Sequence, residues 1–304
     1  MGMAATLVRP GTDDRRDGGF ILLPVLFTLA LLALVSIVLT RTVATDIKQN
    51  ANLLRGAEVE ELSDGIARLT IRYLVGKSGD IDRIGSFRLN GTPVSCTVAN
   101  MVATISVNAA AGLIDINSAS NDVLEALFSH VGADNPKSLT AAVIDFRDAD
   151  GETSPGGAEA PEYQAAGLAH RPQNAPFLTV GELDQVFGMT PEVLARARSL
   201  VTTHSGRSAP DITIASPEVL ALSLPAQVSN RPDRRSLRIR VSVRSGKNAK
   251  IGFTREAAIL LEPRVRGGFL LKEWRKGDQL IEGSGNVGSD ELDSCVYSVL
   301  AAGN

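Results

Sequence analysis

The hydrophobic pattern of the chain begins with twenty consecutive uncharged residues, from Phe20 to Leu39. A helix of this length is about 30 Å long, which matches the hydrocarbon core of a bilayer. Arg9, Arg15 and Arg16 precede the run and favour a cytoplasmic N-terminus. A secretory signal cleaved near Ala44 is the alternative, but its apolar core would be unusually long and no A-x-A site follows. The pattern therefore predicts one transmembrane helix.

The same helix is predicted to continue beyond the apolar run. Apolar residues recur at spacings of three and four, as on one face of a helix, at Val59, Leu62, Ile66, Leu69 and Tyr73. Charged residues occupy most of the positions between them. This amphipathic pattern predicts one long helix from about Phe20 to Val75, ended by the glycines that follow.

Several stretches further along have the turns and alternation of an antiparallel sheet. Residues 86–96 are predicted to form two strands around an Asn90–Gly91 turn, and Val102–Val107 a third strand. Leu237–Arg244 alternates strictly, and Ile251–Leu261 returns beside it. One face of that alternation is apolar. The other face is expected to be solvated and carries Arg238, Arg240, Ser242 and Arg244.

A helical segment, roughly residues 117–226, is predicted between the two groups of strands. It contains an internal repeat, since residues 115–124 match residues 211–220 at six of ten positions. Ser120 and Ser216 have the position of N-caps, and Pro217 suits the first turn of a helix. Similar segments occur in helix-hairpin-helix DNA-binding proteins, but the glycine hairpin that contacts phosphates is missing. We therefore expect a scaffold of capped helices.

Charge and cysteine content narrow the possible functions. The 31 Lys and Arg residues against 34 Asp and Glu give a net charge of -3, which argues against a nucleic-acid partner. Two cysteines exclude a zinc ribbon and an iron–sulfur cluster. Because the bulk of the chain is predicted to be exported, we expect Cys96 and Cys295 to form a disulfide. No catalytic motif is present, and Gly283–Gly288 matches a dinucleotide fingerprint without a surrounding βαβ unit. An enzyme is therefore not expected.

One acidic loop is a candidate metal site. Its carboxylates fall within eighteen residues and are Asp145, Asp148, Asp150, Glu152, Glu159 and Glu162. Hard oxygen ligands in a flexible loop suit calcium, although Thr153 stands where an EF-hand requires glycine. The same cluster also fits a solvated acidic loop. A membrane-anchored, metal-dependent hydrolase with the three aspartates as ligands is the alternative function.

Several motifs resemble one known family. The Gly19–Phe20 junction before the apolar run resembles the leader of type IV pilins, in which a prepilin peptidase cuts after the glycine and the new N-terminus is methylated. The fifth position of the mature chain, usually glutamate, is here Pro24. Proline at this position and four further segments of the chain resemble the protein K family, the minor pseudopilins of type II secretion. The segments are Leu113–Asn117, Asp145–Asp150, Gly157–Glu159 with Tyr163, and Phe177–Leu183.

The resemblance implies an α+β, pilin-like fold with a long N-terminal helix, an antiparallel sheet and a large inserted helical domain. The expected parts are a leader (1–19), a transmembrane segment (20–40), the helix and first strands (41–116), the inserted domain (117–226) and the C-terminal strands (227–304). It also implies calcium in the acidic loop. The expected partners are other minor pseudopilins, prepilin peptidase and the inner membrane, with the bulk of the chain in the periplasm. The implied role is to initiate and cap a filament that exports folded proteins.

Overall fold

The computed structural model describes residues 22–76, 89–98, 101–222, 224, 233–245 and 252–277. The chain divides into two compact units, Met1–Arg55 and Gly56–Asn304. Helix α1, Leu22–Gly76, belongs to both units.

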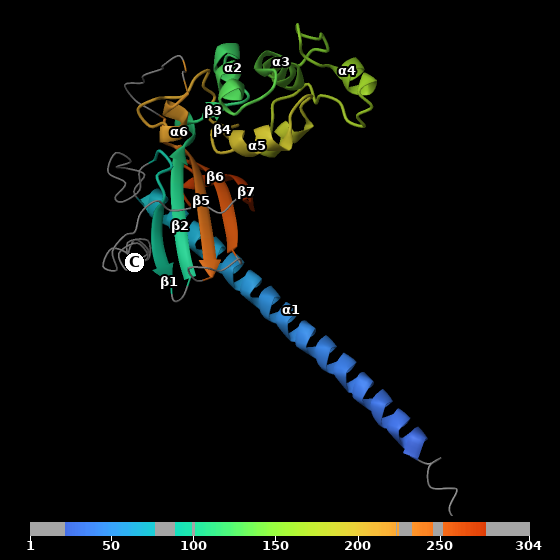
Figure 1. Ribbon diagram of the computed structural model, residues 1–304. Coiled ribbons are helices and arrows are strands. Elements are labelled where there is room, and N and C mark those ends of the chain that lie inside the picture. Colours follow the sequence, from blue (N-terminus) through green and yellow to red (C-terminus); the bar gives the residue numbers. More distant parts are fainter. Residues whose placement is uncertain are drawn as a thin grey trace, which may run out of the picture. The chain divides into compact units, whose positions relative to one another are not determined.

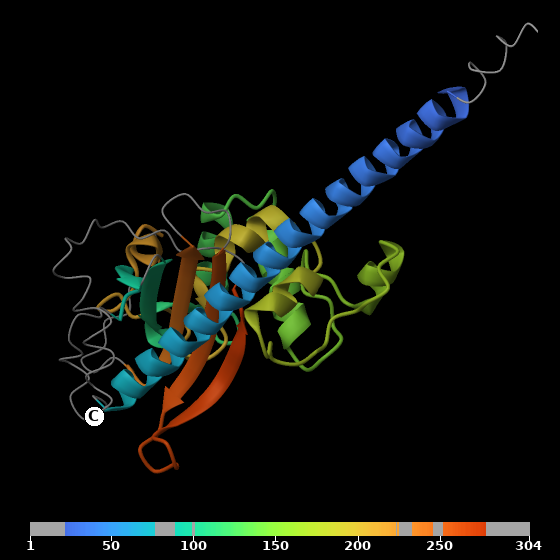
Figure 2. The ribbon, with the colours of Figure 1, turned by 90° about the horizontal axis from the view of Figure 1, so that it is seen from below.

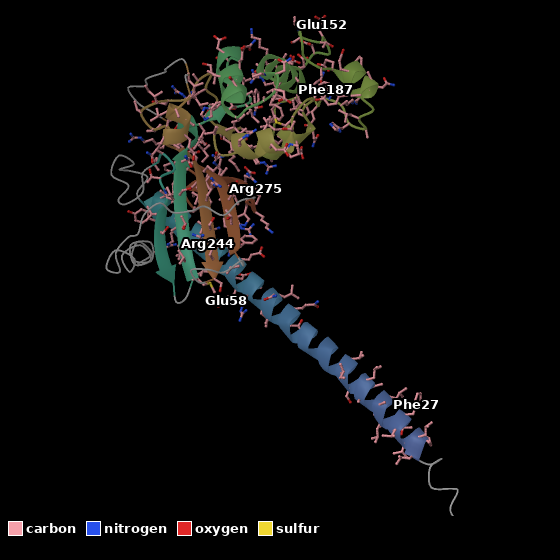
Figure 3. All side chains as sticks on the ribbon, viewed as in Figure 1. Phe27, Glu58, Glu152, Phe187, Arg244 and Arg275 are labelled. Carbon is pink, nitrogen blue, oxygen red and sulfur yellow. The ribbon has the colours of Figure 1, made fainter. Side chains whose placement is uncertain are left out.

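In the first unit, the described part of α1 exposes large apolar side chains. Leu23 is 75% exposed and Phe27, labelled in Figure 3, is 68% exposed. Pro24 lies in the first described turn, where a helix needs no backbone N–H donor. No helix within the described residues combines the length and the hydropathy of a membrane-crossing segment. Phe20, where the predicted span begins, lies outside those residues.

The second unit contains a five-stranded antiparallel sheet with the order β1-β2-β5-β6-β7 (Figure 1). The strands are β1 Val94–Val98, β2 Met101–Ala109, β5 Ser236–Ser245, β6 Gly252–Leu261 and β7 Phe269–Lys276. The mixture of helices and antiparallel sheet predicted from the sequence is confirmed. Strand β7 was not predicted.

One face of the sheet packs against the C-terminal part of α1, which crosses it in Figure 2. Val59, Ile66 and Tyr73 of the predicted apolar stripe are buried, and they share a core with Ile105 and Ile239. Polar contacts fix the same packing. Arg255 of β6 donates to Asp64 at 2.5 Å and to Glu60 at 3.2 Å on α1. The amphipathic pattern therefore predicted the packed face of the helix correctly.

Asn90–Gly91 does not form the predicted hairpin turn. The Leu89 carbonyl accepts from Ala109 N, and Gly91 N donates to the Val107 carbonyl, so this segment runs along β2 in the same direction as β1. Gly91 has φ +81°, and a Cβ there would lie 2.4 Å from Nδ2 of Asn108. Glycine at this position therefore allows the segment to approach β2 closely at the edge of the sheet. The hairpin prediction is wrong. Residues 86–88 lie outside the described residues.

The remaining helices of the second unit form the inserted segment, which lies between β2 and β5 in the sequence. They are α2 Asn121–His130, α3 Pro136–Arg147, α4 Ala160–Ala165, α5 Pro191–Ala197 and α6 Pro217–Leu220, with the 3-10 turns η2 Ala110–Gly112 and η3 Val180–Gln185. Two short parallel strands, β3 Ile114–Asp115 and β4 Val201–Thr202, join this region. It has its own apolar core, in which Leu127, Phe128 and Phe146 are fully buried.

The predicted helix starts are confirmed at both copies of the internal repeat. Ser120 is the N-cap of α2, and Ser216 is the N-cap of α6. The Ser216 hydroxyl accepts from Val219 N at 3.2 Å, and Pro217 is in the first turn. Both copies therefore start a helix, although the Ser120 side chain makes no cap hydrogen bond.

The predicted solvated face of β5 is wrong. Arg238 is buried, because the inserted segment lies over the end of the sheet where β2 ends and β5 begins (Figure 1). Ser242 is also buried, and its hydroxyl lies 2.6 Å from that of Thr254 on β6. The Arg238 guanidinium donates to the carbonyls of Arg198 at 3.1 Å, Ser199 at 2.7 Å and Val201 at 2.9 Å. These carbonyls follow the last turn of α5, where a cation is favourable. The arginine therefore joins the insertion to the sheet.

Candidate functional site

The acidic loop joins α3 to α4, and its path is set at both ends by capping. At the end of α3, the N–H of the C-cap residue Asp148 donates to the Ile144 carbonyl at 3.0 Å. At the start of α4, Glu159 N donates to Oε2 of Glu162 at 2.8 Å. The two helices therefore hold the ends of the loop, and the carboxylates between them have defined positions.

Asp145 is the buried centre of this loop. It lies on the last turns of α3, is fully buried, and accepts from Ser154 N with both oxygens at 3.2 Å. The returning chain passes so close that a Cβ on Gly157 would lie 2.1 Å from Oδ2 of Asp145. Glycine at this position therefore permits the loop to close over the carboxylate.

Two further carboxylates of the loop have an unpaired oxygen each. Among the described residues, Oδ1 of Asp148 and Oε1 of Glu159 are buried without a hydrogen-bond partner. Burial raises the pKa of Asp148, and repulsion from Asp150 and Asp145 raises it further. Burial likewise raises the pKa of Glu159; a hydrogen bond from Asn174 opposes the shift, and repulsion from Asp145 and Asp148 adds to it. The loop thus concentrates negative charge that its own hydrogen bonds do not offset.

The other three predicted ligands have different surroundings. Glu162 accepts from Glu159 N and, at 3.2 Å, from the Thr153 hydroxyl, so it serves as a cap, and the Glu159 amide lowers its pKa. Asp150 is exposed and accepts from Glu152 N at 3.0 Å. Glu152 is exposed on the loop and is labelled in Figure 3. Asp145, Asp148 and Glu159 therefore differ from these three, because Asp145 is fully buried and the other two each have a buried oxygen without a partner.

Across the described ranges, no group of three or more His, Cys, Asp or Glu side chains suited to hold a metal ion is found. The chemistry of the loop nevertheless fits a hard cation, because two buried carboxylate oxygens lack donors and calcium is bound by oxygen ligands. The sequence reasoning missed Asn174. This residue has φ 48°, and its Nδ2 donates to the Asp150 carbonyl. An asparagine beside a proline-containing loop was the available signal.

The family-like motifs meet one another in this part of the structure. The Asn117 side chain donates to the Phe177 carbonyl at 2.9 Å and accepts from Phe177 N at 2.8 Å. Phe177 in turn stacks on Phe146, with ring centroids 4.7 Å apart. The Tyr163 hydroxyl accepts from Phe187 N at 2.8 Å and donates to the Gln185 carbonyl at 3.1 Å. These contacts hold the acidic loop and the following segment on α3.

The remaining predicted site residues fall partly outside the described residues. Cys96 is buried in β1, while Cys295 lies outside them, so the disulfide stays a prediction. Gly19 and Phe20, the predicted processing site, also lie outside.

Comparison with known proteins gives the class of the chain. Residues 100–205 match the sequence profile of the family described as "Type II secretion system (T2SS), protein K". The matched segment contains β2 and the helices that hold the acidic loop. Over this segment, the chain is therefore similar to protein K, a component of type II secretion systems. The resemblance to this family of minor pseudopilins found in the sequence is confirmed. This family is a structural component of the system and is not known for enzymatic activity.

No curated protein matches the chain. One solved structure that matches it is "The Crystal Structure of the GspK-GspI-GspJ complex from enterotoxigenic Escherichia coli Type 2 Secretion System". The match has a TM-score of 0.49 and 17% identity, and it covers 79% of this chain and 100% of the other. Similarity this low supports no transfer of function.

Proposed function

We propose that this chain is the tip subunit of a pseudopilus, where it initiates and caps the filament that exports folded proteins across the outer membrane. The observation that carries the proposal is the protein K segment at residues 100–205. The helix that packs on an antiparallel sheet in the second unit is consistent with a pilin-like subunit. Its partners at the tip would be other minor pseudopilins that pack along α1.

The residue at position 24 supports a place at the tip. In the pilin family, the glutamate of an incoming subunit is thought to neutralise the N-terminal ammonium of the subunit ahead. A charge left unpaired in an apolar environment is costly, so this pairing favours entry into a growing fibre. Pro24 cannot supply the carboxylate. Other subunits could therefore follow this chain, while it could not readily follow them.

The inserted segment supports the same place. Helices α2 to α6, with their own apolar core, are inserted in the sequence between β2 and β5, which are neighbours in the sheet. A subunit stacked directly above would have to accommodate this additional mass. We therefore expect the insertion to be tolerated at an end of the filament and to obstruct the shaft.

Gold labelling of an epitope on the insertion, in overproduced filaments, tests the tip position. The exposed Glu152 loop is a suitable place for the epitope. The wild type should be labelled only at filament ends. Pro24→Glu should restore the missing carboxylate and add some label along the shaft, while Pro24→Ala serves as the control without a charge. Label along the shaft of wild-type filaments would refute the proposal.

The N-terminal processing and membrane anchoring belong to the same proposal. They are supported by the Gly19–Phe20 junction and the uncharged run that follows it. Prepilin peptidase would remove the leader, and the apolar run would anchor the chain in the inner membrane with its bulk in the periplasm. Intact-mass spectrometry of the membrane-extracted protein should give an N-methylated chain that starts at Phe20. A start beyond Ala44 would exclude pilin-type processing.

We further propose that the acidic loop binds calcium. Asp145, Asp148 and Glu159 would provide most of the negative charge at the site, and the two unpaired oxygens support this assignment. A cation there would offset the repulsion that raises the pKa of Asp148 and Glu159. Binding to the folded state alone stabilises it by mass action.

Thermal melts with calcium and with chelator test the site. Calcium should raise the melting temperature, and Asp148→Asn should remove most of the rise. The same variant should melt higher than the wild type in chelator, because it removes repulsion. Glu152→Gln, an exposed position in the same loop, is the matched control and should leave both melts unchanged. Identical melting temperatures of the wild type in calcium and in chelator would refute calcium binding and favour a solvated acidic loop.

A further inference from the structure

A pocket lies where the insertion meets the sheet, and none of the acidic-loop residues line it. It has a volume of about 250 Å³ and lies between the end of α5 and strands β5, β6 and β7. Its lining residues are Pro191, Leu194, Ala195, Arg198, Ser199, Arg240, Glu256 and Arg275. Figure 3 labels Arg275 at the end of the sheet that faces α5.

Positive charge exceeds negative charge in the lining of this pocket. Three arginines converge there with one glutamate, Glu256. That carboxylate is already shared, since Oε1 lies 2.9 Å from Nε of Arg240 and Oε2 contacts Nη2 of Arg275. Arg275 also pairs with Glu273 at 2.5 Å, outside the pocket lining. Arg198 reaches the pocket from the opposite side, at the C-terminus of α5.

The buried Arg238, outside the pocket lining, adds a fourth positive charge that interacts with Arg240, Arg275 and Glu256. Burial lowers its pKa to about 10; Glu256 and Glu273 oppose the shift, and Arg240 and Arg275 add to it. Burial also lowers the pKa of Arg198, and repulsion from Arg275 lowers it further; Asp184 and Glu256 oppose both effects. Four guanidinium groups thus lie close to one another in a partly dehydrated junction, where Glu256, Glu273 and Asp184 offset part of their charge. Repulsion between like charges is strongest where water is excluded.

We infer that this pocket binds a small oxyanion, of the size of phosphate or sulfate. A guanidinium group presents N–H donors in a fixed fork that matches such oxygens, and the pocket offers guanidinium groups from both sides. The anion would contact Arg198 of the insertion and Arg240 and Arg275 of the sheet together. Bound there, it would tie the two parts of the second unit to each other.

The test is a titration of the full-length chain, in detergent micelles and without calcium, with sodium phosphate at constant ionic strength. Sodium chloride is the reference salt. The inference requires a saturable rise in melting temperature and a matching heat of binding by calorimetry. Phosphate also stabilises proteins in general because it is excluded from their surfaces, but that effect grows with concentration and does not saturate. A rise without saturation would therefore overturn the inference.

Two variants and a control locate the effect. Arg198→Gln should weaken phosphate binding at least tenfold, while Arg196→Gln, exposed on the same helix and outside the lining, should bind as the wild type does. Ala195→Glu places a carboxylate at the exposed rim. It should raise the melting temperature in chloride and remove the phosphate effect. Equal loss in Arg196→Gln and Arg198→Gln, or an unchanged phosphate effect in Ala195→Glu, would refute the site.

Discussion

Replacing Arg238 with methionine should lower the free energy of unfolding, because this arginine joins the insertion to the sheet. The variant keeps most of the buried aliphatic stem but removes three hydrogen bonds from a charged donor. At roughly 2 kcal/mol each, these bonds contribute about 6 kcal/mol. Burial opposes this gain, because a pKa lowered from 12.5 to about 10 corresponds to a cost of about 3 kcal/mol for the charged form. The expected net loss in the free energy of unfolding is therefore about 3 kcal/mol.

Urea denaturation of the full-length chain in micelles, followed by circular dichroism, measures this loss. Arg244→Met is the matched control, because Arg244 lies on the same face of β5, partly exposed at the other end of the strand (Figure 3). It should cost about 1 kcal/mol or less, as is usual for a surface charge. If Arg238→Met cost no more than Arg244→Met, the buried guanidinium would not be what joins the two parts.

Three further predictions follow from the structure. Tyr163→Phe should lower the free energy of unfolding by about 1–3 kcal/mol, because Phe187 N and the Gln185 carbonyl lose their partner; wild-type stability in denaturant melts would contradict this. Without calcium, the raised pKa values of Asp148 and Glu159 mean that the folded state binds protons more readily than the unfolded state. The free energy of unfolding should therefore be higher at low pH and should decrease as the pH rises through the folded pKa values; melts in chelator across this range check the sign. Thiol labelling of denatured, unreduced protein should find no reactive cysteine if Cys96 and Cys295 are bridged, and two reactive thiols would exclude the bridge.

Elements governed by local pattern could be predicted from the sequence. The apolar stripe from Val59 to Tyr73 and the strict alternation of Leu237–Arg244 each follow the period of a single element, and the structure contains both. The failures concern contacts between distant segments. Asn90–Gly91 has a sequence typical of a hairpin turn, but the backbone of this segment forms its hydrogen bonds with the end of β2. Arg238 is typical of a solvated position, yet three carbonyls from the insertion receive its donors.

The candidate site shows the same limit. Clustering in the sequence identified the acidic loop, and Asp145, Asp148 and Glu159 do lie in it. The sequence could not separate these carboxylates from Glu162, because the difference depends on which backbone N–H each one reaches after folding. Of the arginine pocket, only Arg240 stood out in the sequence, on the basic face of a predicted strand. The pocket itself could not be recognised, since its members come from one helix and three strands that are far apart in the chain.

The position of the insertion between β2 and β5 affects the order of folding. These strands are antiparallel neighbours, with Ala109 opposite Leu237, so a hairpin of a few residues could connect them. During synthesis, at about 5–20 residues per second, the last helix of the insertion emerges about 1–5 s before β5 is complete. Because the apolar core of the insertion is its own, the insertion can fold in that interval and bring the ends of the two strands together. The long segment then adds little to the entropy of closing the sheet. The same geometry gives a simple evolutionary route, in which a hairpin tip acquires a domain and the strand order of the sheet is unchanged.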